Sequence, residues 1–213
     1  MSAKLQHLGL ALLGLAATLG FAPQDEGNPC APPGRAAVEL RLSMRKLWEE
    51  QHAYARHYLI SALAQLPDRS VVLERLLEMQ DEIGNAVRPY LGSEGGNTLA
   101  RLLRENIKIG ADLIQAVASV DEENLAPLQR KWSQNGVQIA GFLSDSNPSW
   151  SRSRLEQLIE ARQAFTTGEL VARLKKDWAT DLKASDAERA HLLILSDALV
   201  DGIVEQFPEE FPR

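Results

Sequence analysis

From about Ala36 to the end of the chain, apolar residues recur at steps of three and four, and this spacing constrains the fold more than any other feature. No stretch of useful length alternates between apolar and polar residues, as a half-buried strand would. Short connections between long amphipathic helices place neighbouring helices antiparallel. The sequence therefore predicts an all-α fold, an antiparallel bundle of six or seven helices.

Turn and capping residues divide this region into segments. Asn97 is a candidate N-cap, and Thr166 precedes Glu169 by three residues, which is the spacing of a capping box. The stretch 166–182 is therefore either a separate helix or a kinked continuation of the helix before it. Gly84 is expected to allow close helix packing. The other expected helices cover 37–65, 70–91, 97–120, a stretch starting between 121 and 127 and ending at 143, 151–165 and 186–207. The helix over 70–91 is expected to stop at Gly92, before a loop over 93–96.

The N-terminal 22 residues have the pattern of a secretory signal. Lys4 precedes an apolar run of fifteen residues, 8–22, which is shorter than the roughly 20 residues of a membrane span. Pro23 disfavours cleavage after Ala22, so the alternative that this segment is retained as a membrane anchor remains open. We expect an exported protein, periplasmic or extracellular, with a signal or anchor over 1–22, a flexible linker over 23–36 and the bundle over 37–213.

Composition narrows the function classes. The net charge is −6 and the basic residues are dispersed, so we expect no nucleic-acid partner, because nucleic-acid binding depends on a basic surface. The single cysteine, Cys30, excludes an intramolecular disulfide. The sequence has no Gly-x-Ser-x-Gly motif and no phosphate-binding glycine loop. We therefore expect a non-enzymatic protein that contacts a membrane only through the N-terminal segment, if that segment is uncleaved.

Four polar residues fall on apolar helix faces when the segments are projected at about 100° per residue. They are Gln51, Asn106, Arg162 and Arg189. A buried polar group without a partner costs about 1–3 kcal/mol, and a charge costs more. We interpret the four residues as a ligand site inside the bundle, in which the two arginines bind a small anion and the two amides orient it. The alternative is a structural network, or arginines that reach water near helix ends.

Two Glu-x-x-His spacings, at Glu49–His52 and Glu188–His191, are typical of di-iron bundles. The projection places Glu49 opposite the apolar face of its helix and His191 away from its own. We therefore assign no metal ligands and leave any cofactor open.

Several stretches from about Leu42 to Pro208 resemble a functionally unassigned bacterial family of exported all-helical proteins. Members of that family sometimes carry the labels acetylglutamate kinase or glycosyltransferase, and no residue here supports either activity. The stretches that carry the resemblance are 47–50 (LWEE), 66–68 (LPD), 81–85 (DEIGN), 146–148 (SNP) with Trp150, 166–167 (TT), 171–174 (VARL), 177–178 (DW), 197–199 (DAL) and 206–208 (QFP).

The resemblance implies histidine in relatives at the four inward polar positions, and hence a metal held by imidazoles. This chain would have lost that ability, because arginine does not ligate metals and amides are weak ligands. Three functions follow as hypotheses. The first is an extracytoplasmic binding or sensing module for a small anion. The second is a metal-binding or redox bundle with a degenerate histidine site. The third is a structural or partner-binding protein without a small-molecule site.

Overall fold

The structure is a computed structural model that describes residues 34–119 and 121–212. The predicted signal or anchor over 1–22 and most of the predicted linker lie outside the described residues. Within the described part there is no strand, so the predicted all-α fold is confirmed. The α-helices are α1 (Arg35–Leu63), α2 (Arg69–Ala118), α3 (Glu122–Ser146), α4 (Arg152–Leu174) and α5 (Trp178–Gln206), and a 3₁₀ turn, η1 (Pro208–Glu210), follows them.

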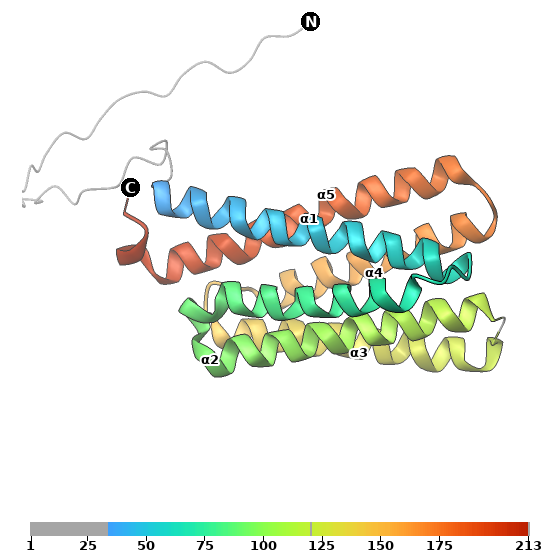
Figure 1. The fold of residues 1–213 in the computed structure, drawn as a ribbon. Helices are drawn as coiled ribbons and strands as arrows, with labels where there is room; N and C mark the ends of the chain where they lie inside the picture. The colour runs from blue at the N-terminus through green and yellow to red at the C-terminus, as the bar shows by residue number, and fades with distance from the viewer. Residues whose placement is uncertain (1–33, 120, 213) are drawn as a thin grey trace, which may run out of the picture. The chain divides into compact units, whose positions relative to one another are not determined.

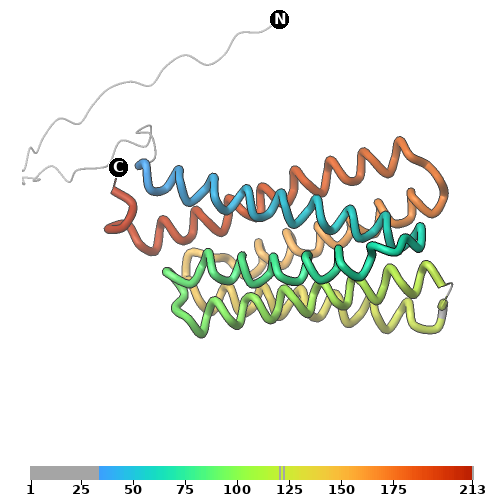
Figure 2. Tube along the Cα trace, in the orientation of Figure 1, coloured from blue at the N-terminus to red at the C-terminus, as the bar shows by residue number. Residues whose placement is uncertain are grey.

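The helices form an antiparallel bundle (Figure 1). Each helix packs against its neighbours in sequence, and α1 also packs against α5. The connections α1–α2, α2–α3 and α4–α5 lie at one end of the bundle, and the start of α1 and the end of α5 lie at the other (Figure 2). None of the described helices is long and apolar enough to span a membrane.

The predicted count of six or seven helices is not matched, since the described residues form five, of which α2 joins two helical arms across a break at Gly92. The expected loop at 93–96 is helical, and Asn97 lies inside α2 rather than at an N-cap. The predicted break at Gly92 is confirmed, because Gly92 has φ 71° and ψ 172° and the chain reverses there, so that α2 has two antiparallel arms (Figure 1). A Cβ on Gly84 would lie 2.5 Å from the carbonyl oxygen of Gly96, which confirms close packing at Gly84.

A second correction concerns 166–182, which is neither a separate helix nor a kinked continuation. α4 runs unbroken to Leu174 and α5 begins at Trp178, where the Asp177 carboxylate accepts a hydrogen bond from the Thr180 backbone N–H. Thr166 does not cap a helix: its hydroxyl lies within hydrogen-bonding distance of the Arg162 carbonyl one turn earlier, as is common for threonine inside helices. The Thr166–Glu169 pair is therefore an interior feature of α4.

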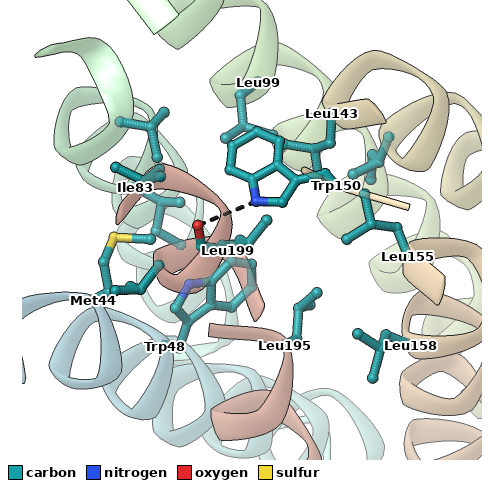
Figure 3. Close-up of a cluster of buried hydrophobic side chains, with 14 of the residues drawn as sticks. Met44, Trp48, Ile83, Leu99, Leu143, Trp150, Leu155, Leu158, Leu195 and Leu199 are labelled. Atoms are coloured by element: carbon teal, nitrogen blue, oxygen red, sulfur yellow. Dashed lines mark hydrogen bonds between the residues drawn. The ribbon is translucent and has the colours of Figure 1, made fainter. Parts of the chain in front are cut away.

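Two main hydrophobic clusters fill the bundle, and a third, small one lies between α2 and α3. The larger main cluster takes residues from all five helices (Figure 3) and includes Met44, Trp48 and Leu158. The smaller main cluster lies toward the three connections and includes Leu59, Ile107 and Leu170. Along α1, α2 and α4 the stretch between the two main clusters carries polar side chains, and these form a buried polar layer.

Candidate functional site

Three of the four residues predicted to face inward are buried in this layer. Gln51 is 1% exposed, Asn106 is 2% exposed and Arg162 is 7% exposed. They come from α1, α2 and α4, and Asn106 and Arg162 are in direct contact. The helical periodicity therefore predicted the inward orientation of these three side chains correctly.

The predicted inward orientation of Arg189 is wrong. Its side chain is 57% exposed, and its guanidinium donates to Glu49 Oε1 at 2.5 Å on the surface between α1 and α5. The neighbouring residue Glu188 is buried instead. The buried positions 181, 185, 188, 192, 195 and 199 of α5 recur on average every 3.6 residues, and this stripe passes through Glu188 rather than Arg189.

Asparagine side chains hold Arg162 in place. Arg162 Nη1 donates to Asn106 Oδ1 at 3.3 Å, and Asn106 Nδ2 donates to Asn135 Oδ1 at 2.7 Å. Asn135 Nδ2 in turn donates to the Leu102 carbonyl at 3.3 Å. This chain of bonds joins α2, α3 and α4, and Asn106 acts as a positioning residue for the guanidinium.

Glu188 is the carboxylate nearest to Arg162. Its Oε1 lies 3.8 Å from Arg162 Nε, beyond hydrogen-bonding distance, and 2.9 Å from the Thr166 hydroxyl. Arg162 Nε has no hydrogen-bond partner among the described residues although it is buried. The arginine therefore has a nearby counter-charge and still has one N–H group available.

A second group of charges lies further along the layer. Arg56 on α1 donates to Glu169 Oε1 at 2.5 Å and to both carboxylate oxygens of Asp181, at 3.2 and 3.1 Å. Arg173 on α4 donates to Asp181 Oδ2 at 2.7 Å. Together with Arg162 and Glu188, the layer holds three arginines and three acidic side chains, so its formal charges balance when all are ionised.

Burial shifts the protonation equilibria of these groups. Desolvation raises the pKa of Glu169 to about 7, against the opposing effect of Arg56. Desolvation also raises the pKa of Glu188, against the effects of Arg162 and Thr166. Burial lowers the pKa of the Arg162 guanidinium. Near neutral pH, Glu169 is therefore a group that can take up or release a proton inside the bundle.

A cavity of about 50 Å³ lies within the layer. Charged and polar side chains line one part and apolar side chains of α1 and α2 line the rest. The Trp132 indole N–H is buried without a hydrogen-bond partner, and Trp132 also lines the cavity. Two side chains that line the cavity, Arg162 and Trp132, therefore each carry an unpartnered N–H donor. The polar and charged residues lining it are Arg56, Asn106, Arg162, Thr166, Glu169 and Glu188.

Gln51 and His52 are buried on α1 and line neither this cavity nor a smaller one of about 20 Å³ that Trp48 and Arg162 line. Both amide atoms of Gln51 are buried without partners. His52 Nε2 lies 3.2 Å from the Ser185 hydroxyl. Desolvation, followed by the charges of Arg162 and Arg56, lowers the pKa of His52 to about 4, so this histidine is neutral at physiological pH.

The sequence did not lead us to predict that Asp181 and Glu188, two of the three acidic residues of the layer, are buried. Asp181 and Glu188 could have been found by extending the stripe of Leu192, Leu195 and Leu199 toward the N-terminus at helical spacing. Arg56 has no comparable signal, because it is partly exposed at the edge of its helix and only its two acidic partners reveal its role.

The arrangement does not resemble a metal site. No group of three or more histidine, cysteine, aspartate or glutamate side chains among the described residues is placed to hold a metal ion. Of the two Glu-x-x-His spacings, Glu49 pairs with Arg189 and His191 Nε2 lies 2.7 Å from the Leu158 carbonyl oxygen.

No protein-family model, curated protein or solved structure matched the chain.

Proposed function

We propose that this chain is an extracytoplasmic binding or sensing module that holds a small anionic ligand in the cavity beside Arg162. The observation that carries the proposal is a guanidinium that is almost fully buried, lines a cavity and has an Nε–H without a hydrogen-bond partner. An unpartnered buried donor is costly, and an anion would satisfy it with a charge-assisted bond.

The volume of the cavity limits the size of the ligand. A cavity of about 50 Å³ gives room for about four water molecules when each needs about 10–15 Å³ of such volume. A carboxylate group or a small oxyanion fits this room, whereas a nucleotide or a sugar does not. Arg162 and the Trp132 indole N–H would donate to the anion, and Asn106 would position Arg162. Gln51, which we also predicted as a ligand-orienting residue, has both amide atoms buried without a partner but does not line the cavity.

The charge balance of the layer sets a condition on binding. Three arginines face three carboxylates, so an anion meets a neutral layer when all six groups are charged. Protonation of Glu169 leaves one positive charge in excess, and the raised pKa of Glu169 places this event near pH 7. We therefore expect anion binding to strengthen as the pH falls from about 8 to about 6.

The test is a thermal-shift screen of the full chain with formate, acetate, nitrate and phosphate, at constant ionic strength with chloride as the reference. We expect at least one anion to raise the melting temperature in a saturable way. The Arg162→Met variant should lose this response, and Arg189→Met should keep it, because Arg189 lies on the surface.

A double variant distinguishes loss of the anion site from loss of the folded structure. Removing Arg162 alone leaves the Glu188 carboxyl buried without its cation, which destabilises a fold by about 3–5 kcal/mol. The double variant Arg162→Met with Glu188→Met removes both charges, and such replacements are often neutral or stabilising. A double variant that folds and still responds to the same anion would rule out the proposed site.

One observation favours a second candidate, a structural or partner-binding protein without a small-molecule site. Arg162 and Arg189 each lie within 4.0 Å of a carboxylate of the protein, Glu188 and Glu49 respectively. Under this alternative, no anion stabilises the wild-type chain, and native mass spectrometry of protein purified from the cell envelope shows the polypeptide mass alone.

A further inference from the structure

The turn between α4 and α5 exposes large apolar side chains at one end of the bundle. Leu174 is 48% exposed, Trp178 is 54% exposed and Leu182 is 56% exposed. The other three tryptophans are between 2% and 7% exposed. Trp178 thus differs from the other tryptophans of the chain: its one described ring contact is with the Arg173 guanidinium, 5.5 Å from the ring centroid, and more than half of its surface stays exposed.

Lysines surround these apolar side chains. Lys175, Lys176 and Lys183 are exposed. The two acidic residues of the turn already have partners: Asp177 accepts from the Thr180 N–H and hydroxyl, at 3.1 and 2.7 Å, and Asp181 pairs with Arg56 and Arg173. The hydrogen bonds from neutral Thr180 leave the Asp177 carboxylate charged. Residues 173–183 carry four basic and two acidic side chains, a net charge of +2, so the turn is locally basic in a chain whose net charge is −6.

We propose that the α4–α5 turn docks on the surface of an anionic lipid bilayer. Leu174, Trp178 and Leu182 enter the interfacial region, and the three lysines contact lipid phosphate groups. Tryptophan is enriched at membrane interfaces because its ring is apolar and its N–H is polar. Lysine near an apolar anchor adds attraction to anionic headgroups. This surface is separate from the apolar run at 8–22 and independent of the proposed anion site.

The surroundings of the turn agree with a docking surface on this side of the bundle end. The α2–α3 connection lies at the same end (Figures 1 and 2) and carries the acidic residues Asp121 and Glu123. Contact with anionic lipid is therefore confined to the side of α4 and α5.

The test measures tryptophan fluorescence of the full chain with vesicles that contain brominated lipid, which quenches tryptophans that enter the bilayer. Vesicles of phosphatidylglycerol with phosphatidylcholine are compared with vesicles of phosphatidylcholine alone. We expect quenching with the anionic vesicles, and the Trp178→Phe variant should remove it, because the other tryptophans are buried. Membrane binding through the N-terminal run is common to both proteins and does not affect this difference.

Charge reversal tests the role of the lysines. Each lysine lost from a membrane-binding surface lowers partitioning about fivefold. The triple variant Lys175→Glu, Lys176→Glu, Lys183→Glu should therefore bind anionic vesicles at least about 100-fold more weakly at the turn, measured by the lipid concentration that gives half-maximal quenching. The control Lys46→Glu, on the exposed face of α1, should leave that concentration unchanged.

Two results would overturn the proposal. One is the same emission quenching in wild type and Trp178→Phe, which would show that the turn does not enter the bilayer. The other is equal quenching of Trp178 by anionic and neutral vesicles with no effect of the triple variant, which would show that the lysines do not recognise lipid phosphate. A soluble protein partner for this turn would give the first result.

Discussion

Trp150 shows how a single residue in a connection fixes the packing of two helices. Its indole N–H donates to the Leu199 carbonyl at 3.2 Å (Figure 3). Asn147 Nδ2 donates to the Gly202 carbonyl at 2.9 Å. The α3–α4 connection is therefore bonded to the backbone of α5 at two points, through Asn147 and Trp150.

Gly202 makes this contact possible, and its replacement is the first stability prediction. A Cβ at position 202 would come within 3.0 Å of the Trp150 indole, so Gly202→Ala must displace the ring and break its hydrogen bond. We expect a loss of about 3 kcal/mol in the free energy of unfolding, measured by urea denaturation.

Gly168→Ala is the matched control for that measurement. Gly168 lies inside α4, and no atom lies within 4 Å of its Cβ position. Alanine has the higher helix propensity, so this change should stabilise the protein by up to about 1 kcal/mol. Equal effects of the two substitutions would mean that Trp150 does not pack as described.

Among the elements, α2 departs most from an ordinary helix. Its two arms are antiparallel, and the reversal is concentrated at Gly92, whose φ of 71° with ψ of 172° is a conformation that essentially only glycine adopts. Close contact between Gly84 and Gly96 then brings the arms together. The turn depends on the backbone conformation of Gly92, whereas the contact depends on the absence of side chains at Gly84 and Gly96.

Gly92→Ala tests the turn without a steric contribution, because no atom lies within 4 Å of its Cβ position. Strain of this kind costs about 1–3 kcal/mol, so we expect destabilisation of that size in urea denaturation. The Gly168→Ala variant again serves as the comparison, since the same chemical change there meets an ordinary helical backbone. A stabilised Gly92→Ala variant would show that the chain does not adopt this conformation at residue 92.

For the molecule as a whole, the buried polar layer links stability to pH through two groups with opposite signs. The pKa of Glu169 is raised from 4.5 to about 7, so its stabilisation is fully present below pH 4.5 and is lost as the pH rises to about 7. The pKa of His52 is lowered from 6.5 to about 4, so its contribution is present above pH 6.5 and is lost as the pH falls to about 4.

Single variants separate the two effects. With about 1.4 kcal/mol for each unit of pKa, each group contributes at most about 3 kcal/mol. Between pH 4.5 and 6.5, Glu169→Gln should make the free energy of unfolding rise more steeply with pH than in the wild type. His52→Gln should make it rise less steeply or fall. Urea titrations at pH 4.5, 5.5 and 6.5 measure both slopes, and parallel curves for the two variants would contradict the assignment.

The sequence by itself determined the fold class, the helix break at Gly92 and the inward orientation of Gln51, Asn106 and Arg162. These features depend on local properties: apolar spacing along a helix, the conformational freedom of glycine, and the face on which a side chain lies. Each of these features depends on residues that lie within a few helical turns of one another in the sequence.

Only the tertiary structure decided which polar groups meet. Arg189 was expected inside because it lies at helical spacing from Ser196, Val200 and Ile203, which are buried. Packing against α1 and α4 buries Glu188 instead. Thr166 and Glu169 have capping-box spacing, yet they face Arg162, Glu188 and Arg56, which come from α4, α5 and α1. The charge balance of the layer depends on side chains from three helices, so the sequence of any one helix does not specify it.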